Sequence, residues 1–231
     1  MTSYHSVTII KLPSGNEEVK GGELLEKEMN TKERILQEAL KLFAQNGYMA
    51  TSMNDIAKKL DISKAALYKH YVSKQEIFDS IVERMNQMDK ERLEQYQMPD
   101  GTFPKMAEKY KSTPLEKIEF FTEVQFRHWT EEDFSCNFRK MLTLEQYRSQ
   151  EMANMYQEYL AEGPIKYMTI LFSEMFKDDE ENSQKAKQIA LDFYGPIFLL
   201  MNMYDNAENK EEMIVLLKEH VERFARMEHL E

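Results

Sequence analysis

The sequence predicts an all-α fold made of a small N-terminal head and a larger C-terminal helical body. The 231-residue chain has only seven glycines and six prolines, which leaves long stretches free of helix breakers. Hydrophobic residues make up 42% and aromatic residues 11% of the chain, as expected of a globular protein. Apolar residues also recur at spacings of three and four along most of the chain, the period of one helix face.

The first predicted helix covers about residues 31–45. Its apolar stripe includes Ile35, Ala39, Leu40 and Phe43. Asn30 and Glu33 have the spacing of a helix cap, and Asn46-Gly47 can end the helix in a left-handed turn. We expect this helix to form the core of the head.

Two short helices joined by a tight turn follow between residues 51 and 70. Ser52 and Asp55 form a capping pair for the first, whose apolar face includes Ile56. Ser63 is a suitable N-cap for the second, from Lys64 to about residue 70, with Leu67 pointing inward. A fourth helix is expected from Ser73, with Glu76 in its capping box, to about residue 97.

The outer face of the second short helix carries small, basic and aromatic residues. Lys64, Ala65, Tyr68 and Lys69 share this face, with His70 close to it. Small residues allow close approach to a surface, and the others can bond to phosphates or base edges. Together with the preceding capped helix, this pattern indicates a helix-turn-helix DNA reader, whereas the pattern alone also fits a solvated lysine face.

Four sequence pieces in order resemble the DNA-binding domain of the tetracycline-repressor (TetR) family of bacterial transcription regulators. They are ILxxAxxLFxxxGY at 35–48, TSMNDIA at 51–57, ISKAALYKHY at 62–71 and SKQEIF at 73–78. The resemblance covers about residues 31–81. It implies a three-helix helix-turn-helix domain at 29–81 and a helical ligand-binding and dimerisation domain at 82–231.

Charge is distributed unevenly along the chain. The net charge is −11 overall, yet residues 58–74 hold five lysines and one aspartate, a local net charge of +4. Residues 81–231 hold 19 basic and 30 acidic residues, a net charge of −11. A basic head on an acidic body is the asymmetry expected of a DNA reader with a second domain.

The body is predicted to begin after a loop at 98–114 that contains a helical turn at 105–110. Thr113-Pro114-Leu115-Glu116 predicts an N-cap at Thr113 with a proline at the first helical position. Helices are expected at 115–131, 133–145, 149–176, 183–205 and 210–228. Gly163-Pro164 and Gly195-Pro196 should kink or interrupt two of them.

The family resemblance implies which residues contact DNA. Lys64, Ala65 and Lys69 would reach bases or nearby phosphates in the major groove. The remaining implied contacts, mostly to phosphates, are Thr51, Ser52, Ser63, Tyr68, His70 and Lys74.

The resemblance also implies a homodimer built on the last two helices, so that two heads read a palindromic duplex. Ordinary core packing is the alternative for each residue of their apolar stripes. The predicted interface residues are Ala186, Ile189, Ala190, Phe193, Ile197, Met201, Met213, Leu217 and Phe224.

Seventeen methionines, mostly after residue 80, lie among many aromatic residues. Such side chains can line an adaptable pocket for an apolar or aromatic ligand, although plain core packing explains them as well. The candidate pocket residues are Phe121, Gln125, His128, Trp129 and Tyr156.

Enzyme chemistry finds no support in the sequence. No histidine pair has metal-ligand spacing, no glycine-rich phosphate loop occurs, and Cys136 lacks the context of a nucleophile. We therefore expect neither a metal nor another cofactor, and Cys136 fits packing better than redox sensing. A lone cysteine and the lack of a secretory signal or membrane span favour the cytoplasm. Residues 1–28 have no helical period and are expected to be a mobile extension or leader.

These observations predict a dimeric DNA-binding repressor that a small apolar or aromatic effector releases from a palindromic operator. The alternative is a DNA-binding protein whose C-terminal domain only oligomerises or docks a partner. A closed, water-poor cavity within 115–205 would favour the first, and a filled core the second.

Overall fold

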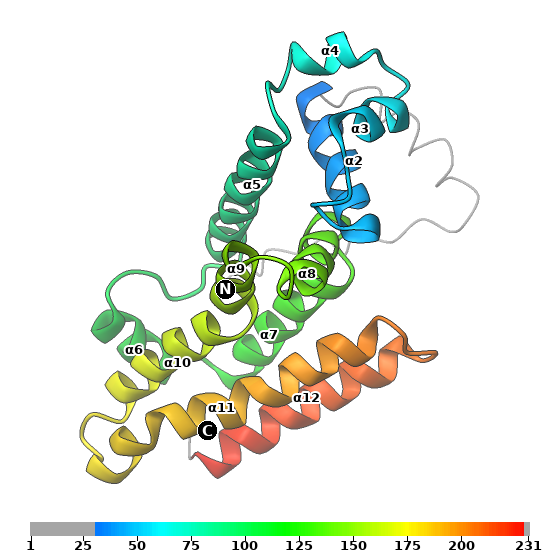
Figure 1. Ribbon diagram of the computed structural model, residues 1–231. Coiled ribbons are helices and arrows are strands. Elements are labelled where there is room, and N and C mark those ends of the chain that lie inside the picture. Colours follow the sequence, from blue (N-terminus) through cyan, green and yellow to red (C-terminus); the bar gives the residue numbers. More distant parts are fainter. Residues whose placement is uncertain (1–30, 229–231) are drawn as a thin grey trace, which may run out of the picture.

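The computed structural model describes residues 31–228, which form eleven α-helices and no strand (Figure 1). The predicted all-α class is confirmed, whereas the predictions for residues 1–28 and for the Asn30 cap lie outside the described residues. The helices are α2 (Thr31–Asn46), α3 (Met53–Lys59), α4 (Lys64–Tyr68), α5 (Lys74–Gln95), α6 (Phe103–Lys111), α7 (Leu115–Thr130), α8 (Asp133–Glu145), α9 (Gln150–Leu160), α10 (Glu162–Met175), α11 (Glu180–Tyr204) and α12 (Lys210–Met227).

Helices α2, α3 and α4 form the head at one end of the molecule, and α5 leads from the head into the body (Figure 1). The local caps form as their sequence predicts. The Asp55 N–H donates to Ser52 Oγ over 3.2 Å, and the Ser52 N–H donates back to Asp55 Oδ2 over 3.0 Å. The Ala66 N–H donates to Ser63 Oγ over 3.1 Å, which starts α4. These bonds satisfy N–H groups that a helix leaves unpaired at its start.

Head and body share one hydrophobic core, because α8 packs along α2. Phe43 and Phe78 from the head lie in the same buried cluster as Phe138 and Met141 from α8. The predicted division at residue 81 therefore does not follow a gap in the packing. A displacement of α8 would act directly on the head.

Two expected features of the body differ in the structure. Residues 103–111 form a complete helix, α6, whose buried residues Met106 and Ala107 pack against α10. The predicted Thr113 cap does not form, because the Thr113 hydroxyl donates to the Lys109 carbonyl oxygen over 2.8 Å. Its hydroxyl is used at the end of α6, and α7 begins after Pro114 without a side-chain cap.

The proline-containing segments behave differently from each other. The predicted interruption near Gly163-Pro164 occurs, with α9 ending at Leu160 and α10 starting at Glu162. Pro164 then lies in the first turn of α10, where its missing N–H has no helical partner to lose. Helix α11 is not interrupted and runs from Glu180 to Tyr204 with Pro196 inside it.

Helices α11 and α12 lie side by side at the end of the molecule opposite α4 (Figure 1). The interface predicted on them is wrong in its residues, because that stripe packs within the chain. Eight of the nine predicted residues are buried, and Phe193 is partly buried against two core clusters. Both helices are apolar on more than one face, and α7 and α10 cover the face that the sequence analysis assigned to a partner.

Candidate nucleic-acid interface and effector cleft

The turn between α3 and α4 holds the second helix at a fixed angle to the first. Asp61 takes a left-handed conformation with φ of 53°, and the Ile62 N–H donates to the Ala57 carbonyl oxygen over 3.0 Å. Leu67 is fully buried against the head, which fixes the orientation of α4 about its axis. The outward face of α4 is therefore set by one buried side chain and one cap.

That outward face presents the residues expected from the sequence. Lys64, Ala65, Tyr68 and Lys69 are exposed, and the Lys64 ammonium lies 5.8 Å from the centre of the Tyr68 ring. Ser63 is also exposed, although its hydroxyl oxygen is used to cap α4. His70 is half-buried, and its backbone N–H donates to the Leu67 carbonyl oxygen.

Two of the expected phosphate contacts have different surroundings from those assumed. Thr51 is only 2% exposed, and its hydroxyl donates to the Gly47 carbonyl oxygen over 2.9 Å. A side chain buried in this way holds the loop before α3 and has no path to a phosphate. Ser52, its neighbour, is exposed and remains available beside its cap bonds.

Lys74 is the second residue whose surroundings differ from those expected. Its ammonium donates to the carbonyl oxygens of Tyr48 and Thr51 over 2.6 Å and 2.8 Å. It also lies 4.3 Å from the centre of the Tyr48 ring, and burial lowers its pKa. Lys74 thus ties the start of α5 to the loop before α3, and the structure gives it a positioning role.

The residues predicted to line an apolar ligand pocket do not form one group. Phe121 is buried beside Tyr96, with ring centres 6.1 Å apart. Trp129 and Tyr156 pack against the shared core of head and body. Gln125 and His128, in contrast, meet around the Arg92 side chain, with Arg92 Nε donating to Gln125 Oε1 over 2.7 Å.

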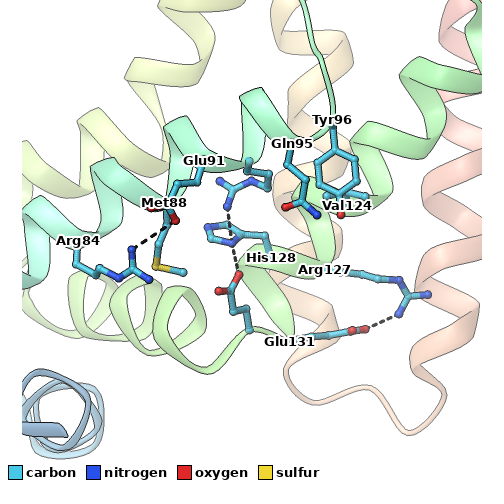
Figure 2. A pocket seen from close by; sticks show the side chains of 11 residues that line it. Arg84, Met88, Glu91, Gln95, Tyr96, Val124, Arg127, His128 and Glu131 are labelled. Carbon is cyan, nitrogen blue, oxygen red and sulfur yellow. Dashed lines mark hydrogen bonds and ion pairs between the residues drawn. The ribbon is translucent and has the colours of Figure 1, made fainter. Parts of the chain in front are cut away.

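An open cleft of about 510 Å³ lies between α5 and α7, and its walls are polar. Figure 2 shows His128 at the centre of the side chains that line it. The expectation of an apolar or aromatic lining is not met here, because six of the eleven lining residues are arginine or glutamate. The cleft is lined by Arg84, Met88, Glu91, Arg92, Gln95, Tyr96, Val124, Arg127, His128, Glu131 and Glu132.

Arg92 and Glu132 are cleft residues that the sequence analysis missed. Arg92 is 8% exposed and continues the inward stripe of Met85 and Met88 along α5. An arginine at a position where the helix period calls for an apolar residue is the signal that could have identified it. Glu132 follows His128 by four residues and accepts from its ring, a spacing visible in the sequence.

Comparison with known proteins places the head in a defined family. The family model of bacterial regulatory proteins of the tetR family matches residues 35–81, which span α2, α3, α4 and the start of α5. The chain is 26% identical over 186 residues to the Staphylococcus aureus biofilm operon icaADBC HTH-type negative transcriptional regulator IcaR, covering 75% of this chain and 98% of that protein. The Staphylococcus epidermidis IcaR is 44% identical over 52 residues, 22% of this chain and 28% of that protein.

Solved structures agree with this assignment over most of the chain. A transcriptional regulator of the TerR/AcrR family from Aquifex aeolicus VF5 superposes with a TM-score of 0.54 at 25% identity, covering 86% of this chain and 99% of that one. Mycobacterium smegmatis AmtR shares the fold with a TM-score of 0.54 at 15% identity, covering 85% and 87% of the two chains. The head is a DNA-binding domain of the TetR type.

These matches identify the protein as a DNA-binding transcription regulator with a TetR-type head, rather than an enzyme. Within residues 31–228, no group of three or more His, Cys, Asp or Glu side chains is placed to hold a metal ion. None of the helices in the same range is long and apolar enough to cross a membrane.

Proposed function

We propose that this regulator is a repressor that binds a palindromic operator as a homodimer and leaves it when a small molecule enters the α5/α7 cleft. The exposed face of α4 carries the proposal, because it offers cations and a small residue on a helix whose orientation Leu67 fixes. The sign of regulation is inferred from IcaR, which is described as a negative regulator.

The DNA contacts proposed for α4 divide into two kinds. Lys64, Ala65 and Lys69 lie on the face that would enter the major groove, where lysine recognises guanine and small residues allow close approach. Ser52 and Tyr68 would hold phosphates on either side of the groove, with Ser63 and His70 nearby. Lys74 supports these contacts indirectly by holding the loop before α3.

The proposed dimer uses the outer faces of α11 and α12. Leu191, Leu199 and Met203 are exposed on α11, and Val215 and Leu216 are exposed on α12. Gly195 lies between Leu191 and Leu199 on α11, and a Cβ there would have nothing within 4 Å, so this position leaves room for a partner helix. A second copy of the chain is the occupant that a palindromic site requires.

The α5/α7 cleft is the proposed effector site because of its connections to the head. Its α5 wall is joined to α4 by residues 69–73, and α8, which begins just after Glu132, packs on α2. A ligand that binds one arrangement of these helices more tightly would change the spacing of the two heads. The runner-up, a C-terminal domain that only oligomerises or docks a partner, is favoured by the packing of Trp129 and Tyr156 into the core.

The deciding experiment is a search for bound duplexes with the purified protein. We expect selection from random DNA to give a palindrome, bound by two protomers, with a homologous site upstream of a gene next to the regulator. Transcription from that promoter should fall when the protein is added. Recovery of no preferred sequence, or activation of the promoter, would overturn the repressor assignment.

A further inference from the structure

The outward face of α4 offers hydrogen-bond donors but no carboxylate or amide side chain. Helix α4 lies at the outer end of the head, opposite α11 and α12 (Figure 1). Residues 63–70 contain no Asp, Glu, Asn or Gln, and both lysines of this stretch, Lys64 and Lys69, are exposed. The Ser63 oxygen already accepts the Ala66 N–H. A surface of this kind binds best to groups that accept hydrogen bonds.

Lys64 is the cation best placed to reach a base. It is the first residue of α4, and the buried side chain of Leu67 fixes the direction in which it points. Its ammonium lies 5.8 Å from the centre of the Tyr68 ring and bonds to no acceptor within residues 31–228. The Lys74 ammonium, in contrast, is already bonded to loop carbonyl oxygens. The first residues of a recognition helix are those that contact base edges.

The four bases present different groups to an ammonium in the major groove. Guanine presents two adjacent acceptors, O6 and N7, whereas cytosine presents only its N4 amino group, a donor. Adenine places its N6 amino group beside N7, and thymine offers the single acceptor O4. Because an ammonium can only donate, it gains most from guanine and is repelled by the amino groups of cytosine and adenine.

Ala65 adds an apolar contact beside Lys64. Its methyl group is exposed at the second position of α4. Thymine carries a methyl group in the major groove, and alanine is among the side chains that pack against it. The two first residues of α4 therefore suit a guanine and a thymine.

We propose that Lys64 reads a guanine in each half-site of the operator through O6 and N7, and that Ala65 packs against the methyl group of a nearby thymine. The inference deepens the proposed function and rests on it, because α4 must enter the major groove for either contact to form. Lys69, at the opposite end of α4, then contributes affinity rather than base preference.

Base analogues in the selected operator test the guanine contact. Each guanine is replaced in turn, in both half-sites, by 7-deazaguanine, which lacks the N7 acceptor but still pairs with cytosine. We expect one position at which this replacement lowers the affinity, measured by fluorescence anisotropy, by at least about fivefold. 7-Deazaadenine at the adenines is the matched control and should change the affinity by less than about twofold, since the face has no amide. The proposal is overturned if no 7-deazaguanine lowers the affinity, or if 7-deazaadenine lowers it as much.

A change of side chain tests the assignment to Lys64. Lys64→Gln replaces the ammonium by an amide, which recognises adenine through N6 and N7. Selection from random DNA should therefore give adenine where the unaltered protein selects the sensitive guanine. Lys59→Gln removes the same charge at an exposed position in the last turn of α3, and should keep the guanine. A guanine that Lys64→Gln still selects at this position would contradict the assignment.

Uracil in place of thymine tests the contact with Ala65, because it removes only the methyl group. We expect one thymine in each half-site at which uracil lowers the affinity by about fourfold. Ala65→Gly should bind the thymine and uracil operators equally. A loss of stability in this variant would weaken both operators alike and leave their ratio unchanged. A preference for thymine that survives in Ala65→Gly would show that Ala65 does not contact the methyl group.

The same measurements separate the base assignment from the proposed function. An unaltered protein that selects a palindrome without any dependence on guanine N7 remains a DNA-binding regulator, and the assignment to Lys64 is then wrong. An unaltered protein that selects no duplex disproves the proposed function, and the base assignment fails with it.

Discussion

Glu145, at the end of α8, packs against the backbone of Gly47 in the head. The Glu145 side chain is 0% exposed, and its Oε1 accepts from Arg148 Nη1 over 2.8 Å. A Cβ built on Gly47 would overlap both of these atoms, and Gly47 also has φ of 90°. The contact joins the body helix that borders the cleft to the loop that precedes the helix-turn-helix.

Gly47→Ala should therefore destabilise the protein and weaken DNA binding. We expect a loss of about 1–3 kcal/mol in the free energy of unfolding, because the new methyl group meets an ion pair and a strained backbone. Chemical denaturation provides the measurement. Gly101→Ala is the control, because Gly101 also has positive φ, at 120°, but a Cβ there has nothing within 4 Å. Equal losses in both variants would show that the Glu145 contact contributes nothing.

Replacing Lys69 and replacing Lys74 should change the salt dependence of DNA affinity differently. Lys69→Ala removes an exposed cation from the proposed interface, so the slope of log affinity against log salt should fall by about 1. Lys74→Met removes three bonds to loop carbonyl oxygens and should lower the melting temperature while the salt slope stays unchanged. Binding titrations across a salt series, with a thermal melt of each variant, check both. A reduced salt slope for Lys74→Met would show that Lys74 contacts a phosphate directly.

Leu199→Arg should convert the protein to a monomer. Leu199 is 59% exposed in the C-terminal half of α11, so the substitution leaves the core intact and places a charge in the proposed interface. Light scattering after gel filtration reports the mass, and operator affinity should fall by at least about tenfold as the two heads lose their linkage. Ile170→Arg, at 46% exposed on α10, is the matched control and should remain dimeric. A dimeric Leu199→Arg variant would place the interface elsewhere.

His220 should make the protein less stable in mild acid. Burial lowers its pKa, and its Nε2–H donates to the Phe193 carbonyl oxygen over 2.8 Å. The unfolded chain takes up the proton first, so stability falls as the pH drops through the unfolded value of about 6.5 toward the lower folded value. His220→Gln should show a flatter dependence of unfolding free energy on pH. If the unaltered protein and His220→Gln showed the same pH dependence of unfolding free energy, His220 would not be the cause of the acid destabilisation.

Local features of the head were predictable from the sequence because their bonds join neighbours in the chain. Ser52 with Asp55, Ser63 with Ala66, and Gly47 after α2 each involve residues within four positions of one another. The features that could not be predicted from the sequence depend on contacts between residues far apart in the chain. Lys74 bonds to carbonyl oxygens more than twenty residues away, and nothing in its local pattern distinguishes it from a phosphate-binding lysine.

The same limit explains the two errors in the body. Helix α11 carries apolar residues on several faces, so periodicity could not tell whether Ile197 or Leu199 faces the core. The cleft was missed because its character comes from Arg92 on α5 meeting His128 on α7, a pairing across 36 positions. Composition favoured an apolar pocket, but most of the aromatic residues named for it are packed in the core.

The role of α4 in reading DNA is tested by the affinity of the Lys64→Ala/Tyr68→Ala double variant for the selected operator, measured by fluorescence anisotropy. Both side chains are exposed on α4, so the circular dichroism and the mass of the dimer should not change. We predict a loss of at least about tenfold in operator affinity relative to the unaltered protein. An unchanged affinity in a folded, dimeric variant would show that α4 does not read the DNA.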